Sequence, residues 1–144
     1  MNGFLLDTNV ISELIKPRPA ASVAAWVDSN NEELFFLSVL TLGEIRKGIA
    51  ALPGTARRAA LDAWLENALR PRFAGRILPV DEAVADRWGL IAAVASSSGR
   101  PLPVIDGLLA ATALERGLVL VTRNLADIAA TGVAVFNPWE QPDG

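Results

Sequence analysis

Short apolar runs alternate with longer amphipathic segments along this chain. The apolar runs lie at residues 4–6, 34–37, 77–80, 118–121 and 133–136. Runs of this length between turn-forming residues are typical of buried strands, whereas helices need longer segments. We therefore expect about four or five short strands.

The segments between these runs have helical spacing. After Ser38, apolar residues recur at Val39, Leu42, Ile45 and Ile49, which places them on one stripe of a helix. Proline and glycine mark the ends of such segments, and Gly117 is placed as a C-cap. The expected helices begin near Asp7 and Ser38 and cover residues 20–29, 55–69, 81 to the break at 96–99, 104–116 and 124–130. Pro71 and Gly75 mark a loop after the helix at 55–69.

Strands that alternate with helices predict an α/β fold of three layers, in which helices cover both faces of a central, mainly parallel sheet. The 144 residues are the size of one ordinary domain, so we expect a single domain over residues 1–144. In such sheets, ligands bind at the carboxyl ends of the strands. Polar residues that follow the strands are therefore the first candidates for a site.

The chain contains neither cysteine nor histidine. This composition excludes disulfides, thiolate zinc sites and catalytic triads that use histidine. Catalysis would have to use carboxylates, hydroxyls, Lys, Arg, backbone groups or a bound ion. Carboxylate oxygens favour a hard cation, Mg²⁺ or Mn²⁺.

The net charge of −3 is unevenly placed along the chain. Residues 46–76 hold seven basic and two acidic side chains, a segment that either faces a polyanion or forms solvated helix faces. The first residues lack the basic and apolar regions of a signal peptide, and no stretch is long enough to span a membrane. We therefore expect a cytoplasmic protein.

Three acidic residues stand out by their positions. Asp7 directly follows the first strand, where it is either a helix N-cap or a ligand at the sheet edge. Glu44 borders the apolar stripe of the helix that begins near Ser38, which suits a solvated edge residue or a carboxylate pointing toward Asp7. Asp106 lies in a mostly apolar run, where an ionised group needs a partner or a metal.

A fourth polar group follows the apolar run at 118–121. Asn124 and Asp127 are spaced as a capping box, and they are also candidates for the edge of a metal site. These two residues are weaker candidates than the three acids because the capping pattern alone accounts for them.

Several segments resemble PIN domains, specifically the VapC and FitB-like toxins of bacterial toxin-antitoxin pairs. The resemblance begins with Leu-Leu-Asp-Thr-Asn-Val-Ile-Ser-Glu at 5–13 and continues in order over nearly the whole chain. Its other segments are Leu-Gly-Glu-Ile-Arg-Lys-Gly at 42–48, Phe-Ala-Gly-Arg-Ile-Leu-Pro at 73–79, Asp-Gly-Leu-Leu-Ala-Ala-Thr-Ala at 106–113, Val-Thr-Arg-Asn at 121–124 and Phe-Asn-Pro-Trp at 136–139.

The resemblance implies a metal-dependent ribonuclease with Asp7, Glu44 and Asp106 as the metal-binding, catalytic acids. It also implies that Thr8 or Thr122 supports the site, with Asn9 beside them. The family often has a fourth acid where this chain has Asn124, which weakens a site for a second ion. The remaining implications are a cognate VapB-like antitoxin, a homodimer, and an RNA substrate whose backbone we expect to meet Arg46, Lys47 and Arg123.

Other functions fit the sequence less well. An aspartyl-phosphate enzyme of the haloacid-dehalogenase type would place a second Asp where Asn9 stands, and a receiver domain would need a late lysine, but the only lysines are Lys16 and Lys47. A P-loop is also absent. The non-enzymatic alternative is a catalytically inactive PIN-like module that binds RNA or protein, although binding alone gives no reason to gather three acids. The apolar stripe of Leu61, Trp64, Leu65 and Leu69 suits either a partner surface or the core.

Overall fold

The computed structural model describes residues 2–126 and 128–140. In this part of the chain, five strands form one parallel sheet in the order β3-β2-β1-β4-β5. The central strand β1 pairs with β2 on one side and with β4 on the other, so that Leu5 lies between Phe36 and Leu120. The strands are β1 (Phe4–Leu6), β2 (Phe35–Ser38), β3 (Ile77–Leu78), β4 (Val119–Val121) and β5 (Val135–Phe136).

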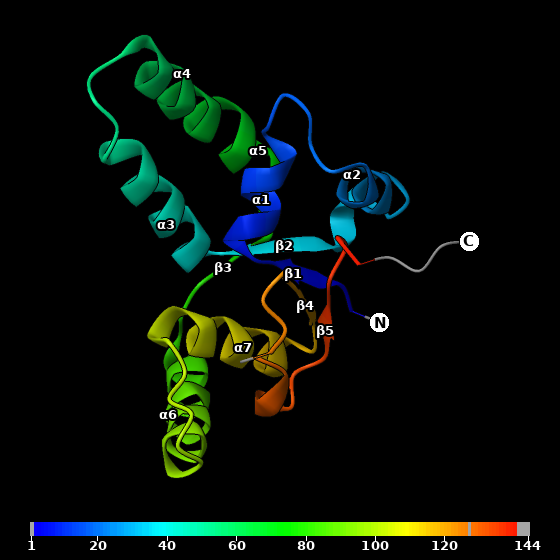
Figure 1. Ribbon diagram of the computed structural model, residues 1–144, viewed down its shortest axis with the longest axis vertical. Helices are drawn as coiled ribbons and strands as arrows, with labels where there is room; N and C mark the ends of the chain where they lie inside the picture. The colour runs from blue at the N-terminus through cyan, green and yellow to red at the C-terminus, as the bar shows by residue number, and fades with distance from the viewer. Residues whose placement is uncertain (1, 127, 141–144) are drawn as a thin grey trace.

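Helices cover both faces of this sheet, as Figure 1 shows. One layer, above the sheet in that view, contains α1 (Thr8–Leu14), α2 (Ala21–Asp28), α3 (Val39–Ala50) and α4 (Ala56–Trp64). The opposite layer contains α6 (Glu82–Ser97) and α7 (Val104–Arg116). The predicted three-layer α/β architecture with four or five strands is therefore confirmed. None of the described helices is long and apolar enough to cross a membrane.

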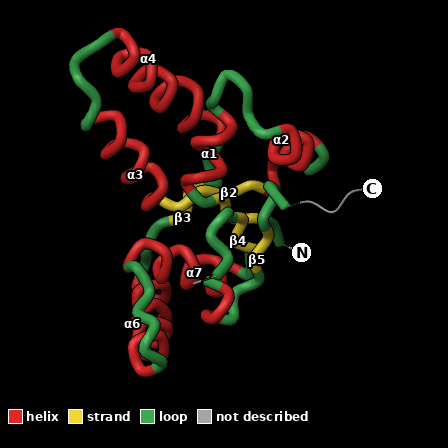
Figure 2. Tube along the Cα trace, in the orientation of Figure 1, coloured by secondary structure: helices red, strands yellow, loops and turns green. Residues whose placement is uncertain are grey.

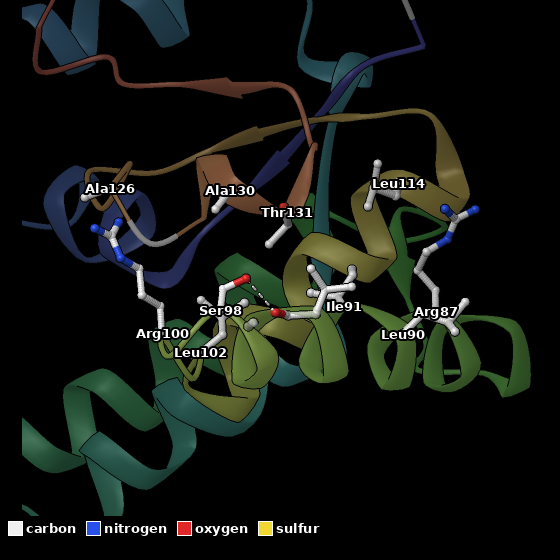
Figure 3. Close-up of a pocket in the computed structure, with 12 residues that line it drawn as sticks. Arg87, Leu90, Ile91, Ser98, Arg100, Leu102, Leu114, Ala126, Ala130 and Thr131 are labelled. Atoms are coloured by element: carbon white, nitrogen blue, oxygen red, sulfur yellow. Dashed lines mark hydrogen bonds between the residues drawn. The ribbon is translucent and has the colours of Figure 1, made fainter.

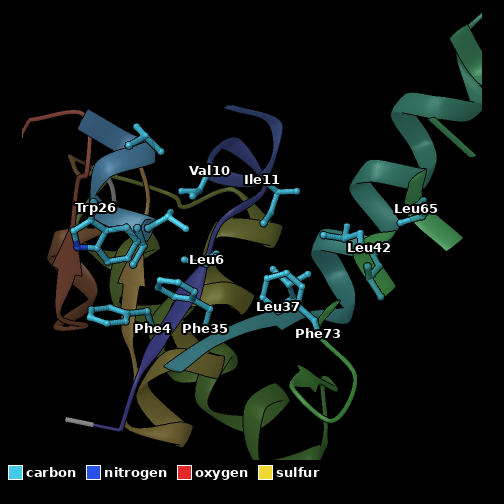
Figure 4. Close-up of a cluster of buried hydrophobic side chains, with 14 of the residues drawn as sticks. Phe4, Leu6, Val10, Ile11, Trp26, Phe35, Leu37, Leu42, Leu65 and Phe73 are labelled. Carbon is cyan, nitrogen blue, oxygen red and sulfur yellow. The ribbon is translucent and has the colours of Figure 1, made fainter. Parts of the chain in front are cut away.

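Two hydrophobic clusters hold the layers together. Alternate side chains of β1 point to opposite faces, so that Phe4 and Leu6 join one cluster and Leu5 joins the other. In the first cluster, the ring centre of Trp26 lies 5.0 Å from that of Phe4 (Figure 4). It also lies 5.2 Å from the ring centre of Phe136. This packing fixes the central strand, at whose end the first candidate acid stands.

One expected boundary was wrong. Pro71 does not begin a loop, because a π-helical segment (Leu65–Leu69) carries the chain from α4 into α5 (Arg70–Arg72). In that segment the Arg70 N–H donates to the Leu65 carbonyl five residues back, and this wider turn gives room to a proline that has no N–H to donate. The stripe on this helix serves the core: Leu65 and Leu69 are buried, and Leu61 and Trp64 pack against the same cluster.

The helix expected over residues 124–130 is also not observed. The described residues there form turns (Figure 2, green) that end in the short 3-10 helix Ala129–Thr131. The Asn124 N–H donates to Thr122 Oγ1 at 3.1 Å, so the hydroxyl of Thr122 shapes this turn. Asp127, the other half of the expected capping box, lies outside the described residues.

Candidate active site

The end of β1 places Asp7 at the carboxyl edge of the sheet. The Asp7 N–H continues the ladder by donating to the Val121 carbonyl at 2.9 Å, and its side chain then caps α1 by accepting from the Thr8 N–H at 2.7 Å. Asp7 is thus both the N-cap of α1 and a residue of the candidate site. One carboxylate oxygen serves the helix, and the second is available for other contacts.

Burial changes the chemistry of Asp7, whose exposed fraction is only 8%. Burial raises the pKa of this carboxyl, and the charge of Glu44 raises it further, while hydrogen bonds from Thr122 and Thr8 lower it. The Thr122 hydroxyl donates to Asp7 Oδ2 at 2.8 Å. The net result is a raised pKa, which favours the protonated form of Asp7. A nearby cation would act against this effect and favour the ionised form.

Glu44 reaches the same edge from α3. The helix begins at Ser38, whose side chain caps it at the end of β2, and Glu44 lies six residues further along. The Thr8 hydroxyl donates to Glu44 Oε1 at 2.6 Å. Thr8 therefore holds both acids, Asp7 through its backbone and Glu44 through its side chain.

Asp106 comes from the first turn of α7, in the opposite layer. The next residue, Gly107, packs against Trp88 of α6 so closely that a Cβ there would lie 2.9 Å from Trp88 Cδ1. The absence of a side chain at Gly107 thus sets how closely the start of α7 approaches α6, and through it the position of Asp106.

The three acids line one open cavity of about 470 Å³ at the carboxyl ends of β1 and β4. In the described part of the chain, however, they do not meet as a ready-made cluster of metal-ligating acids. Like charges repel at short range, and threonine hydroxyls hold two of these acids separately. The other residues that line the cavity are Thr8, Asn9, Ser12, Glu13, Lys16, Arg123, Asn124 and Trp139.

The cavity suits a hard cation by the chemistry of its donors. Its acids and Asn9 offer oxygen ligands, and it contains neither imidazole nor thiolate. Asn9 Nδ2 donates to Thr122 Oγ1 at 3.4 Å, whereas the buried Asn9 Oδ1 has no hydrogen-bond partner among the described residues. A buried oxygen without a partner costs free energy, and a cation or water at this position would supply one. Mg²⁺ commonly uses one or two carboxylates and keeps several waters, which fits acids that do not converge fully.

The basic residues expected to meet RNA have different surroundings. Arg46 forms ion pairs with Asp62 of α4 and Glu66 of the π-helical segment, so its guanidinium ties α3 to the next helix, and it does not line the cavity. Lys47 is exposed but does not line the cavity. Arg123 does line the cavity, with its guanidinium 5.0 Å from the ring centre of Trp139.

Sequence reasoning did not assign a role to four residues that line the cavity. Ser12, Glu13 and Lys16 follow Asn9 at helical spacing, which places all of them on one face of the segment from α1 onward. This polar stripe was a readable signal. Trp139 belongs to a segment that the resemblance included, but nothing in its local pattern indicated a position beside residues of α1.

A second cavity, of about 260 Å³, shares none of these residues. It lies between α6, the end of α7 and the 3-10 helix Ala129–Thr131, and its lining is mostly apolar (Figure 3). Leu90 and Val94 of α6 border it and are 66% and 64% exposed. This part of the surface is not suited to metal chemistry.

Comparison with known proteins identifies the family of this chain. The PIN domain family pattern matches residues 4–131. Toxin FitB of Neisseria gonorrhoeae is 44% identical over 94% of this chain and 97% of its own, and VapC ribonuclease Y4jK of Sinorhizobium fredii is 40% identical with the same coverage. The crystal structure of FitAcB from Neisseria gonorrhoeae has a TM-score of 0.91 at 43% identity over 96% of this chain and 99% of that chain. The chain therefore belongs to the PIN domain family and, within it, is related to toxins of the FitB and VapC type.

Proposed function

We propose that this protein is a metal-dependent endoribonuclease and the toxin of a toxin-antitoxin pair. One observation carries the proposal: Asp7, Glu44 and Asp106, which come from three separate elements of a PIN fold, line a single cavity at the carboxyl edge of the sheet. The name of the Sinorhizobium fredii relative, a ribonuclease, supports RNA as the substrate class.

The three acids, with Asn9 Oδ1, would hold the divalent cation, Mg²⁺ or Mn²⁺. Such an ion supplies Lewis acidity: it polarises a phosphoryl oxygen and lowers the pKa of water. Asn124 also lines the cavity and offers a carbonyl oxygen without charge. Asp127 is the other candidate for a fourth ligand.

The residues of the chain then have separate tasks in hydrolysis. The Thr8 hydroxyl keeps Glu44 in place, and the Thr122 hydroxyl keeps Asp7 in place. A carboxylate oxygen of Glu44 or Asp106 accepts the proton of a water that attacks the phosphorus in line. The bond to the 3′ oxygen breaks, and that oxygen takes a proton from solvent. Cations at the cavity rim offset the repulsion between the acids and the substrate phosphates.

Cleavage of structured cellular RNAs, measured with and without Mg²⁺, tests this proposal. We expect cleavage with Mg²⁺ or Mn²⁺ and none in excess chelator, because the chain has no histidine or cysteine to activate water instead. Asp106→Asn should abolish cleavage while its far-UV circular dichroism stays that of the wild type. Undiminished cleavage by Asp106→Asn, with contaminating nucleases excluded, would contradict the proposal, and RNA binding without any cleavage would favour the inactive binding module.

We further propose a small VapB-like antitoxin as one partner, because a similar solved structure, VapBC-5 from Mycobacterium tuberculosis, is described as a member of the VapBC family of toxin-antitoxin systems. A second copy of the chain is the other proposed partner, as the resemblance to these toxins implies. The exposed Leu90 and Val94 on α6 are our candidates for contacts between two copies. Leu90→Glu together with Val94→Glu should convert a dimer into a monomer in sedimentation experiments. Leu61→Ala is the control: Leu61 packs against the core, so this change should lower the free energy of unfolding instead. A dimer that survives both glutamates would place the contact elsewhere.

A further inference from the structure

Glu13 is a buried acid at the cavity that the proposed hydrolysis does not use. Only 6% of its surface is exposed. Its Oε1 accepts from Lys16 Nζ at 2.9 Å, and its Oε2 accepts from the Ala20 N–H at 2.9 Å. Hydrogen bonds from Lys16, Ala20 and the Trp139 side chain lower the pKa of Glu13, against the effect of burial. Glu13 is therefore a fixed anion with donors on several sides.

The contacts of Glu13 lead to both cations that line the cavity. Lys16 contacts it directly, and Trp139 connects it to Arg123, whose guanidinium lies over the indole ring. Trp139 is itself held by the hydrogen bond from its backbone N–H to Asn137 Oδ1 at 2.9 Å and by packing of its side chain against the core. Among the described residues that line the cavity, Lys16 and Arg123 are the basic ones.

Both cations keep the capacity to bind phosphate. A guanidinium that lies over an aromatic face, as that of Arg123 does, can still use its in-plane N–H donors for a bidentate contact with phosphate. The Lys16 side chain is 57% exposed, and an ammonium group has three donors, of which one is directed to Glu13. A polyanion that approaches three acids requires such positive charge at the same rim, because phosphate and carboxylate repel each other.

We propose that Glu13 and Trp139 are positioning residues that hold Lys16 and Arg123 at the rim of the acidic cavity, where these two cations bind phosphates of the RNA backbone. This inference rests on the proposed function. The sequence predicts that Arg123 meets RNA, and the structure adds Lys16 and the two residues that orient the cations. Trp139 acts through Arg123, and Glu13 acts through Lys16 and Trp139.

The first test measures KM and kcat separately on one defined RNA at several salt concentrations. Lys16→Gln and Arg123→Gln should each raise KM about tenfold, with kcat within about twofold. Each should also reduce the slope of log KM against log salt by about 0.7, the effect of one lost phosphate contact on a single strand. Arg57→Gln, an exposed site on α4 outside the cavity, is the matched control and should leave KM and slope unchanged.

The second test separates positioning from structural support. Trp139→Leu removes the aromatic face and should raise KM about fivefold, whereas Trp139→Phe retains a face and should raise it about twofold or less. Glu13→Gln should raise KM at least as much as Lys16→Gln does, because Glu13 orients Lys16 directly and Arg123 through Trp139. The double variant of Glu13 and Lys16 should be little worse than Glu13→Gln alone, because Lys16 is already misplaced in that single variant.

Direct RNA binding keeps this inference distinct from the proposed function. In an Asp106→Asn background, RNA affinity should fall with Lys16→Gln and Arg123→Gln even if no variant cleaves RNA. If the wild type cleaves and these variants keep its KM, affinity and salt slope, the inference is wrong while the proposed function stands. Variants of Glu13 and Trp139 that lower only kcat and the melting temperature would show a structural role and would also overturn it.

Discussion

The hydroxyl of Thr8 donates a 2.6 Å hydrogen bond to Glu44 Oε1, which joins residues 36 positions apart in the sequence. The same residue donates its N–H to Asp7, so that one threonine sets the separation between two acids of the cavity. Ligands held by such outer contacts lose about 10- to 100-fold in metal affinity or activity when the contact is removed.

Thr8→Val should therefore weaken divalent binding and cleavage about tenfold, because Glu44 loses the donor that orients it. Thr8→Ser keeps the hydroxyl and should retain most of the activity. Titration calorimetry with Mn²⁺ and the cleavage rate measure the two effects. Equal values for Thr8→Val and the wild type would show that Glu44 needs no such support.

Thr41→Val provides a matched control with an opposite expectation. Thr41 is fully buried on α3, and its hydroxyl has no hydrogen-bond partner among the described residues. Replacing it with the isosteric valine should leave cleavage unchanged and raise the free energy of unfolding by about 1–2 kcal/mol, since a buried polar group without a partner is removed. A destabilised Thr41→Val protein in urea unfolding would imply that the hydroxyl does have a partner.

Gly107→Ala should displace the start of α7. Its Cβ would lie 2.9 Å from Trp88 Cδ1, and both groups are held by helices that pack along each other. We expect a loss of about 1–3 kcal/mol in the free energy of unfolding, together with a reduced cleavage rate, because Asp106 moves with its helix. The second change Trp88→Leu should restore part of both. Gly89→Ala, where a Cβ would meet nothing within 4 Å, is the control and should change little.

Acid should weaken the fold through Glu13 and Glu32. Hydrogen bonds from Lys16 and Arg72, respectively, are the largest causes that lower the pKa of these carboxyls in the folded protein. Their stabilising contribution is complete above the unfolded pKa of about 4.3 and is lost as the pH falls through the lower folded value. Asp7 acts in the opposite sense, because burial raises its pKa and stability on its account falls as the pH rises.

Urea unfolding in chelator between pH 3 and pH 7 measures this effect. The deficit of Glu13→Gln and of Glu32→Gln relative to the wild type should be largest at neutral pH and should shrink toward pH 3. Glu33→Gln is the control, since Glu33 is exposed and forms no salt bridge with the described residues. A deficit independent of pH would show that neither carboxylate acts through its charge.

The features that sequence reasoning predicted well depend on local patterns. The apolar runs located the strands, and the polar residue after the first run located Asp7, because a parallel sheet brings strand ends to one edge. The helix at Val104–Arg116 was predicted with its Gly117 cap, where φ is 67°. Such features require only the neighbours of a residue in the chain.

The features that were missed depend on distant partners. Arg46 is paired with Asp62 and Glu66, and no spacing within α3 reveals the acids of a different helix. After β4, the Thr122 hydroxyl accepts a hydrogen bond from the Asn124 N–H. This local bond stabilises a turn in place of the helix that the pattern from Asn124 predicts. The contact between Trp139 and Arg123 joins the ends of two neighbouring strands and becomes visible only in the assembled sheet.

Asn124 and Asp127 allow the fourth position of the site to be tested. Asn124 lines the cavity with the three acids, but it brings no charge. Asn124→Asp should therefore tighten Mn²⁺ binding and lower the metal concentration for half-maximal cleavage, since a fourth carboxylate adds an anionic ligand. If Asp127 already supplies that charge, Asn124→Asp should change little and Asp127→Asn should instead weaken binding markedly. Metal titrations of both variants beside the wild type distinguish these cases, and titrations that neither variant shifts would limit the site to Asp7, Glu44 and Asp106.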